Sequence, residues 1–183
     1  SLPVSVIDRS GRVHESTESF RTGTSRPHVV LSEVLANAAG PEPDQEWIEL
    51  YNDGTAAVQL EGWIIEDVGG ETVLPAHRLE PGAFVLVVND RHVVDPEIDV
   101  PPVAGTVLLR VARLGKQGLS NAGELLRLRR PDGTVVSRFP ALQHTEGGVS
   151  QARREPGAAD GDPTAFGPHA APGASPGGPN QLE

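Results

Sequence analysis

Short apolar runs separated by turn residues fill the middle of this sequence, and they leave few choices of fold. No segment keeps apolar residues at the spacing of an amphipathic helix. Short strands at regular spacing are typical of two packed sheets, so the pattern predicts an all-β sandwich. The seven predicted strands are residues 29–35, 47–51, 63–65, 84–88, 106–111, 124–128 and 134–139. Residues 90–105 form the longest predicted loop, because its three prolines cannot continue a strand ladder.

The run from Trp47 to Tyr51 is the most informative of these strands. Side chains alternate along a strand, so Ile48 and Leu50 face one way. Trp47, Glu49 and Tyr51 then form a stripe on the opposite face. An Asn-Asp-Gly turn signal follows, and the next predicted strand begins near the second tryptophan. We interpret the two runs as adjacent strands of the sandwich.

Motifs spread along the chain resemble those of bacterial lamin tail domains, and they occur in the same order. The resemblance covers roughly residues 28 to 180. Each motif is weak alone, but their common order makes the match specific. The motifs are Ser32-Glu33-Val34, residues 46–52, Leu60-x-Gly62-Trp63, Leu74-Pro75, Leu79-x-Pro81-Gly82, residues 118–124, residues 130–136, and Pro172-Gly173 with Pro179-Asn180.

This resemblance implies an immunoglobulin-like β-sandwich that has no catalytic centre of its own. Bacterial members of the family usually form one module of secreted or envelope proteins, so we expect an extracellular or cell-envelope location. The resemblance also implies that Trp63 packs in the interior. Glu33 and Glu49 match acids of the family pattern on neighbouring strands. We expect them to accept hydrogen bonds from loop amides or an arginine, because a buried unpaired carboxylate is costly.

The chain divides into three regions. Residues 1–27 form an extension, and its segment 3–27 resembles the last two strands of a preceding bacterial immunoglobulin-like domain. Residues 28–155 form the predicted sandwich. Residues 156–183 form a tail in which 12 of the 25 residues from 156 to 180 are Pro or Gly, a composition that does not favour regular structure. This tail either packs on the domain through Phe166 or is a free linker.

Composition excludes several classes of protein. The chain has no Cys, which removes disulfides, zinc–thiolate sites and thiol catalysis. No apolar stretch approaches the length of a membrane span, and no secretory leader stands at the start. We expect a fragment or mature form of a larger protein, which leaves a removed leader or an upstream domain open.

The net charge of −10 hides an asymmetry between two parts of the chain. Residues 28–109 carry 15 acidic and 2 basic residues, whereas residues 110–138 carry 7 basic and 2 acidic residues. Arg127 and Arg129 alternate with leucines and could form a basic strip for an anionic polymer. The alternative is that these charges pair across neighbouring strands. No aromatic side chains interleave with the basic residues, so nucleic acid is not the favoured partner.

Catalytic and metal-binding motifs are absent from the sequence. The six histidines stand apart, without the spacing of a metal site. Ser120 lies in a Gly-x-Ser-x-x-Gly stretch that misses the nucleophile-elbow spacing. Asp95, Glu97 and Asp99 alternate and could bind calcium in an extended conformation, although the prolines around them favour a plain solvated loop. A paired-carboxylate hydrolase stays open, but nothing selects a pair, so we predict no metal, no cofactor and no enzymatic activity.

We therefore interpret the chain as a non-catalytic binding or positioning module of a larger bacterial exported or cell-surface protein. The candidate binding residues are the stripe of Trp47, Glu49 and Tyr51 and the strip of Arg127 and Arg129; an exposed sheet edge is a third candidate. The stripe is either a platform for a sugar ring or a partner strand, or a face covered by another part of the chain. Protein or cell-envelope polysaccharide is the expected partner. The alternatives are a passive spacer, or an accessory domain of a secreted nuclease or phosphatase whose catalytic domain lies elsewhere.

Overall fold

The computed structural model describes residues 2–7, 13–18 and 28–182, and it describes the first two ranges by their backbone alone. Strands β1 (Leu2–Ile7) and β2 (Val13–Glu18) pair antiparallel as a two-stranded sheet. This agrees with the hairpin pattern of the N-terminal extension. The rest of segment 3–27, residues 8–12 and 19–27, lies outside the described residues. The proposed kinship of the hairpin with a preceding immunoglobulin-like domain stays a prediction.

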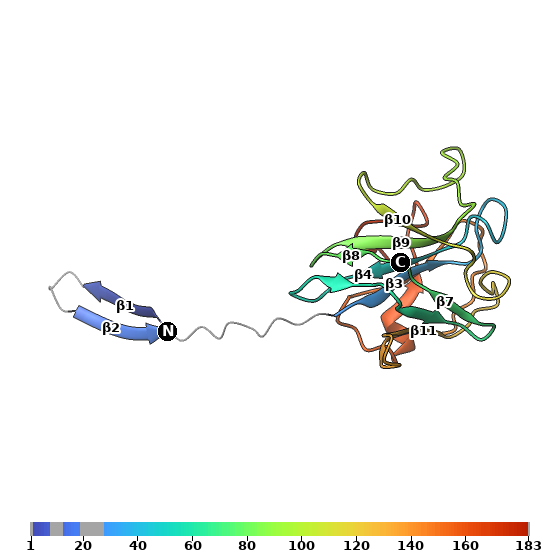
Figure 1. The fold of residues 1–183 in the computed structure, drawn as a ribbon. Helices are drawn as coiled ribbons and strands as arrows, with labels where there is room; N and C mark the ends of the chain where they lie inside the picture. The colour runs from blue at the N-terminus through green and yellow to red at the C-terminus, as the bar shows by residue number, and fades with distance from the viewer. Residues whose placement is uncertain (1, 8–12, 19–27, 183) are drawn as a thin grey trace.

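Two larger sheets and one two-stranded sheet make up the rest of the described fold (Figure 1). The larger sheet has six strands in the order β10-β9-β4-β3-β13-β14, and only its β10–β9 pair is parallel. Its strands are β3 (Val30–Leu35), β4 (Trp47–Tyr51), β9 (Phe84–Asn89), β10 (Val107–Val111), β13 (Gln151–Arg153) and β14 (Phe166–Pro168).

The smaller sheet has four strands in the order β12-β11-β6-β7, and all of its pairs are antiparallel. These strands are β6 (Ile64–Glu66), β7 (Glu71–Val73), β11 (Leu126–Arg129) and β12 (Val135–Phe139). A further two-stranded pair joins β5 (Val58–Gln59) to β8 (Arg78–Leu79), and a single 3₁₀ turn spans Pro163–Ala165. The predicted all-β, immunoglobulin-like sandwich is confirmed.

The main core lies between the two sheets, and strand alternation fills it. Ile48 and Leu50 of β4 point inward with Val85 and Val87 of β9. The smaller sheet contributes the inward side chains of β6, β11 and β12 to the same cluster. Trp63 belongs to this cluster, as predicted, and the Arg130 guanidinium lies 5.7 Å from the centre of its ring. Burying apolar area on this scale is the dominant favourable term for such a fold.

After β4 the chain leaves the larger sheet, and β6, which follows Trp63, belongs to the smaller sheet. Strand β4 pairs with β3 and β9, whereas β6 pairs with β7 and β11 in the other sheet. Our interpretation of the two aromatic runs as adjacent strands is therefore wrong. Asn52 explains the exit, because its buried Nδ2 donates to the carbonyl oxygens of Ala56 and Leu79. A turn held by these bonds redirects the backbone toward β5.

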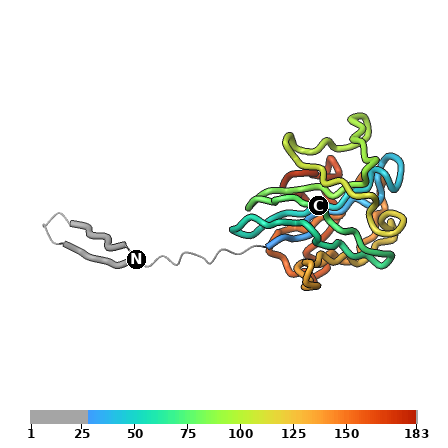
Figure 2. The backbone as a smooth tube through the Cα atoms, in the orientation of Figure 1, coloured from blue at the N-terminus to red at the C-terminus, as the bar shows by residue number. Residues whose placement is uncertain are grey.

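The C-terminal segment is part of the sandwich. Figure 2 shows it, in orange and red, among strands from the first half of the chain. Phe166 is buried in the main core, where its ring meets the ring of Phe139 edge-on at 4.9 Å. The expectation that this region lacks regular structure is wrong for β14, because the buried ring fixes the backbone beside β13. The role of Phe166 as an apolar anchor is confirmed.

No helix among the described residues is long and apolar enough to cross a membrane.

Candidate binding groove

Glu33 and Glu49 stand opposite each other on β3 and β4, on the face of the larger sheet that points away from the main core. Both are 0 % exposed. Glu33 accepts hydrogen bonds from the Ser150 hydroxyl and from the amide and hydroxyl of Ser175, the latter two at 3.0 Å. Glu49 accepts from the Gly177 amide at 2.7 Å. The predicted structural role of the two acids is confirmed, and most of their donors come from the C-terminal tail.

Trp47 lies under the same tail. It is 5 % exposed and packs in a second apolar cluster with Leu35, Leu86 and Val88 of the sheet and Ala174 of the tail. Val100 of the long loop packs against this cluster. The structure therefore covers Trp47 and Glu49, as the second of our two alternatives for the stripe describes. Neither side chain is accessible to a ligand while the tail is in place.

Tyr51 is the member of the stripe that the tail leaves partly open. Its ring stacks on the ring of Phe84, with centroids 4.4 Å apart and planes 28° apart. The pair lines a groove of about 360 Å³. Pro179 and Asn180 of the tail form one wall, and Arg154 with its neighbour Glu155 lies on another. A concave site of mixed character with a few polar groups is the usual form of a small-ligand site.

The polar rim of this groove is free to act on a ligand. Arg154 and Glu155 are exposed, and neither side chain forms an ion pair with another described residue. Arg153, behind them, differs because its guanidinium is buried and bonded on all sides. The groove therefore combines an aromatic pair with one unpaired cation and one unpaired anion.

Arg127 and Arg129 lie on the outer face of β11 and pair with acids of the adjacent strands. Arg127 Nη1 lies 3.0 Å from Glu66 Oε1, and Arg129 Nε lies 2.8 Å from Glu66 Oε2. Arg129 also contacts Glu71 of β7. Charge pairing across the sheet, one of our two alternatives, is thus what the structure shows. These contacts leave little free positive charge for an anionic polymer.

The residues of the candidate calcium loop form a turn and are not extended. Asp95 Oδ1 accepts from the Glu97 amide at 3.0 Å, and Asp99 Oδ2 accepts from the Asp95 amide at 2.7 Å. The three carboxylates therefore do not line one side of a strand. Within residues 28–182 no group of three His, Asp or Glu side chains is arranged to hold a metal ion.

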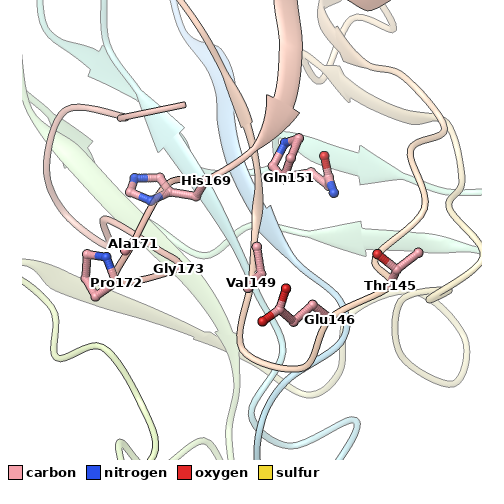
Figure 3. Close-up of a pocket in the computed structure, with 9 residues that line it drawn as sticks. Thr145, Glu146, Val149, Gln151, His169, Ala171, Pro172 and Gly173 are labelled. Carbon is pink, nitrogen blue, oxygen red and sulfur yellow. The ribbon is translucent and has the colours of Figure 1, made fainter. Parts of the chain in front are cut away.

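Another cavity, of about 420 Å³, lies beside β13 and β14 (Figure 3). Its polar walls are already used by the fold: His169 Nε2 accepts from the Gln181 amide, and Gln151 Nε2 donates to the Gln143 carbonyl. Glu146 is its exposed charged group. This cavity has no aromatic surface, so the Tyr51 groove is the better candidate site.

Ser120, Glu124 and His144 meet around a third cavity, which the separation of these residues in the sequence did not suggest. They do not form a nucleophilic relay, because the Ser120 amide donates to Glu124 and the buried His144 Nδ1 has no partner. Burial lowers the pKa of His144 to about 4. The cavity of about 10 Å³ has room for one water and none for a substrate.

The described residues thus define an immunoglobulin-like β-sandwich module with a surface groove and no assembled catalytic group. Comparison with protein families gives a match to the Lamin Tail Domain over residues 22–141, and the chain belongs to the lamin tail domain family. That family consists of immunoglobulin-like structural domains that are generally non-catalytic. A search of curated proteins found no match.

Proposed function

We propose that this chain is a binding and positioning module of a larger bacterial exported or cell-surface protein, and that it acts through the Tyr51 groove. The partly exposed Tyr51–Phe84 pair is the observation that carries this proposal. The tail buries Trp47 and Glu49, whereas these two rings stay partly open in the groove. The proposed partner is a protein or a cell-envelope polysaccharide outside the cell or in its envelope.

The chemistry of the groove favours a saccharide as the first partner to test. Sugar rings offer apolar C–H faces to aromatic rings and hydroxyl groups to charged side chains. The Tyr51–Phe84 pair supplies the first kind of contact, and Arg154 with Glu155 supplies a donor and an acceptor beside it. The volume of about 360 Å³ suits one or two sugar rings.

The experiment is an NMR titration of residues 28–182 with soluble fragments of peptidoglycan glycan strands. We expect shifts to cluster at Tyr51, Phe84 and Arg154. Tyr51→Ala should weaken binding by about tenfold or more, because a central aromatic contact is worth about 1–3 kcal/mol. Tyr51→Phe keeps the ring and should bind nearly as well as the natural chain.

The matched control is Arg138→Ala, which removes an exposed arginine of β12 that does not line the groove. It should bind the fragments like the natural chain, whereas Arg154→Ala should not. Shifts elsewhere with an unaffected groove would point to another surface. A spectrum unchanged by glycan fragments and by envelope protein extracts would favour the spacer, or an accessory domain that serves a separate hydrolase.

A further inference from the structure

Two carboxyl groups face each other beneath the tail. Glu33 and Glu49 form a register pair and are completely buried. No Lys or Arg of the described chain forms an ion pair with either. His169 is the other titratable group that acts on Glu33. His169 lowers the pKa of Glu33, against the larger opposite effect of burial.

The donors that reach the pair are too few for two carboxylates. Glu33 receives the Ser150 hydroxyl and both donors of Ser175. Glu49 receives the Gly177 amide at Oε2, and a side-chain hydrogen bond from Ser32 also lowers its pKa, but its buried Oε1 has no hydrogen-bond partner. A buried carboxylate oxygen without a donor is costly, and two adjacent negative charges add to that cost. Burial raises the pKa of both groups, and Glu33 raises that of Glu49 further.

The segment that supplies these donors is held along its length. Ala174 packs on the Trp47 cluster, and the carbonyl oxygens of Gly173 and Pro176 accept from the amides of Ser150 and Val103, both at 2.9 Å. At the end of the segment, Asn180 Nδ2 donates to the Arg153 carbonyl at 2.8 Å and to the Ser32 carbonyl at 3.2 Å. Between these contacts, the two carboxyl groups hold the segment at the Ser175 and Gly177 amides.

We propose that residues 172–180 form a releasable strap, and that it stays on the sheet only while Glu33 and Glu49 share a proton. Loss of the proton leaves two like charges in one register pair, with Oε1 of Glu49 buried and without a donor. Water can reach the carboxylates only if the strap lifts, so rising pH favours the released form. Release uncovers Trp47 and its apolar neighbours.

The strap also regulates the groove, because Pro179 and Asn180 form one of its walls. Lifting the strap removes this wall and exposes the apolar cluster around Trp47 beside the Tyr51–Phe84 pair. A ligand fitted to the closed groove binds more weakly as the strap leaves. This second step rests on the proposed function, whereas strap release does not.

The test is amide hydrogen exchange by NMR on the whole chain, from about pH 5 to about pH 9, corrected for intrinsic exchange rates. We expect the protection of the Ser175 and Gly177 amides to fall by about tenfold or more across this range. Protection at the centre of β9, at Val85 to Val87, should stay constant because those amides lie inside the sheet. Constant protection of Ser175 and Gly177 across the range would overturn the proposal.

Two variants make the test specific. Glu49→Gln keeps an oxygen for the Gly177 amide and cannot ionise, so its strap protection should no longer depend on pH. Glu46→Gln changes another buried acid, which accepts from Leu119 and not from the tail, and should leave the pH dependence of Gly177 intact. If amide protection at Ser175 and Gly177 depended on pH in the Glu49→Gln variant as it does in the natural chain, the shared proton would be refuted. Because exchange is read without ligand, a groove that binds no glycan leaves this result unaffected.

Discussion

At the scale of single residues, Arg153 connects several strands and the C-terminal tail through its buried guanidinium group. It is 1 % exposed, and its guanidinium donates to the carbonyl oxygens of Leu31, Ala158 and Arg138. Nη2 also lies 2.6 Å from Asp160 Oδ1, and the group sits 4.6 Å from the ring centre of Phe166. Strands β3, β12, β13 and the tail therefore share one buried cation.

Arg153→Met should lower the free energy of unfolding by about 3–5 kcal/mol, because it leaves Asp160 and several carbonyl groups without their buried partner. Arg153→Lys keeps the positive charge but not the planar guanidinium with its several donors. The Lys variant should therefore lose less unfolding free energy than the Met variant, but still a measurable amount. Urea unfolding followed by tryptophan fluorescence measures both. The exposed neighbour Arg154→Ala is the control and should change stability by no more than about 0.5 kcal/mol. Equal stability of the Met variant would show that the guanidinium is not structurally required.

Glu46 gives a prediction about pH. Burial, helped by the nearby carboxyl groups of Glu42, Glu124 and Asp44, raises its pKa to about 7 against the lowering effect of the Leu119 amide. Because the folded-state pKa lies above the unfolded value near 4.5, the folded protein binds the proton more tightly between these values. The stabilisation that protonated Glu46 gives to the folded state is fully present below about pH 4.5 and is lost as the pH rises through about 7.

Glu46→Gln should remove that part of the pH dependence. We expect thermal melting of the variant to lose less stability than the natural chain between about pH 5 and about pH 7. His144 acts in the opposite sense, since its pKa is lowered to about 4 and its protonation in acid costs stability. The comparison of the two chains at each pH cancels this effect. Parallel curves would mean that Glu46 is ionised in the fold throughout.

At the scale of strands, β14 shows that one ring can order a segment rich in Pro and Gly. Phe166→Ala should lower the free energy of unfolding by about 3–5 kcal/mol, because it leaves a cavity in the core and removes the aromatic ring that packs against the Arg153 guanidinium. Phe166→Leu should cost less, since it refills most of the volume. Hydrogen exchange at Gln151 to Arg153 then reports whether β14 has separated from β13. Unchanged exchange in the Ala variant would contradict the anchor.

The ion pairs of β11 give a second prediction at this scale. Arg127→Glu with Arg129→Glu places like charges against Glu66 and Glu71. We expect the free energy of unfolding to fall by about 1–3 kcal/mol. This decrease should become smaller with added salt, because the side chains are partly exposed and salt screens their charges. The matched control is Arg113→Glu, which reverses an exposed charge outside these pairs. A double variant as stable as the control would show that the pairs contribute nothing measurable.

The strands that could be predicted from sequence are those with a strong alternating pattern. The seven predicted runs overlap β3, β4, β6, β9, β10, β11 and β12. Strands β5, β7 and β8 have only two or three residues, which is too short for periodicity to register. Gln151–Arg153 is polar, and its burial depends on partners distant in the sequence. The local sequence pattern does not show which distant residues will form hydrogen bonds with these polar side chains.

The candidate site was predictable only in part, for a related reason. Alternation correctly placed Trp47, Glu49 and Tyr51 on one face, but coverage of a face depends on where a distant segment docks. The family pattern indicated a structural role for Glu49, and Gly177 supplies its bond. Phe84, which completes the groove with Tyr51, carried no signal beyond its place in a predicted strand.

At the scale of the whole molecule, the fold extends past the part that the family match covers. The match ends at residue 141, whereas β13, β14 and the strap supply Arg153, Phe166 and the donors to Glu33 and Glu49. A fragment of residues 28–141 should therefore show no cooperative thermal transition. Residues 28–182 should show one, and circular dichroism with calorimetry compares the two. Cooperative melting of the shorter fragment would mean that the sandwich folds without the C-terminal segment.

Strand β3 sits in the middle of the larger sheet, and its partner β13 comes from nearly the other end of the chain. Arg153 and Leu31, which bond across these strands, are 122 residues apart. All strands from β3 to β13 must have left the ribosome before this seam can close. The larger sheet is consequently completed after the synthesis of the domain and not strand by strand during it, and the long sequence separation of its central contacts favours slow folding.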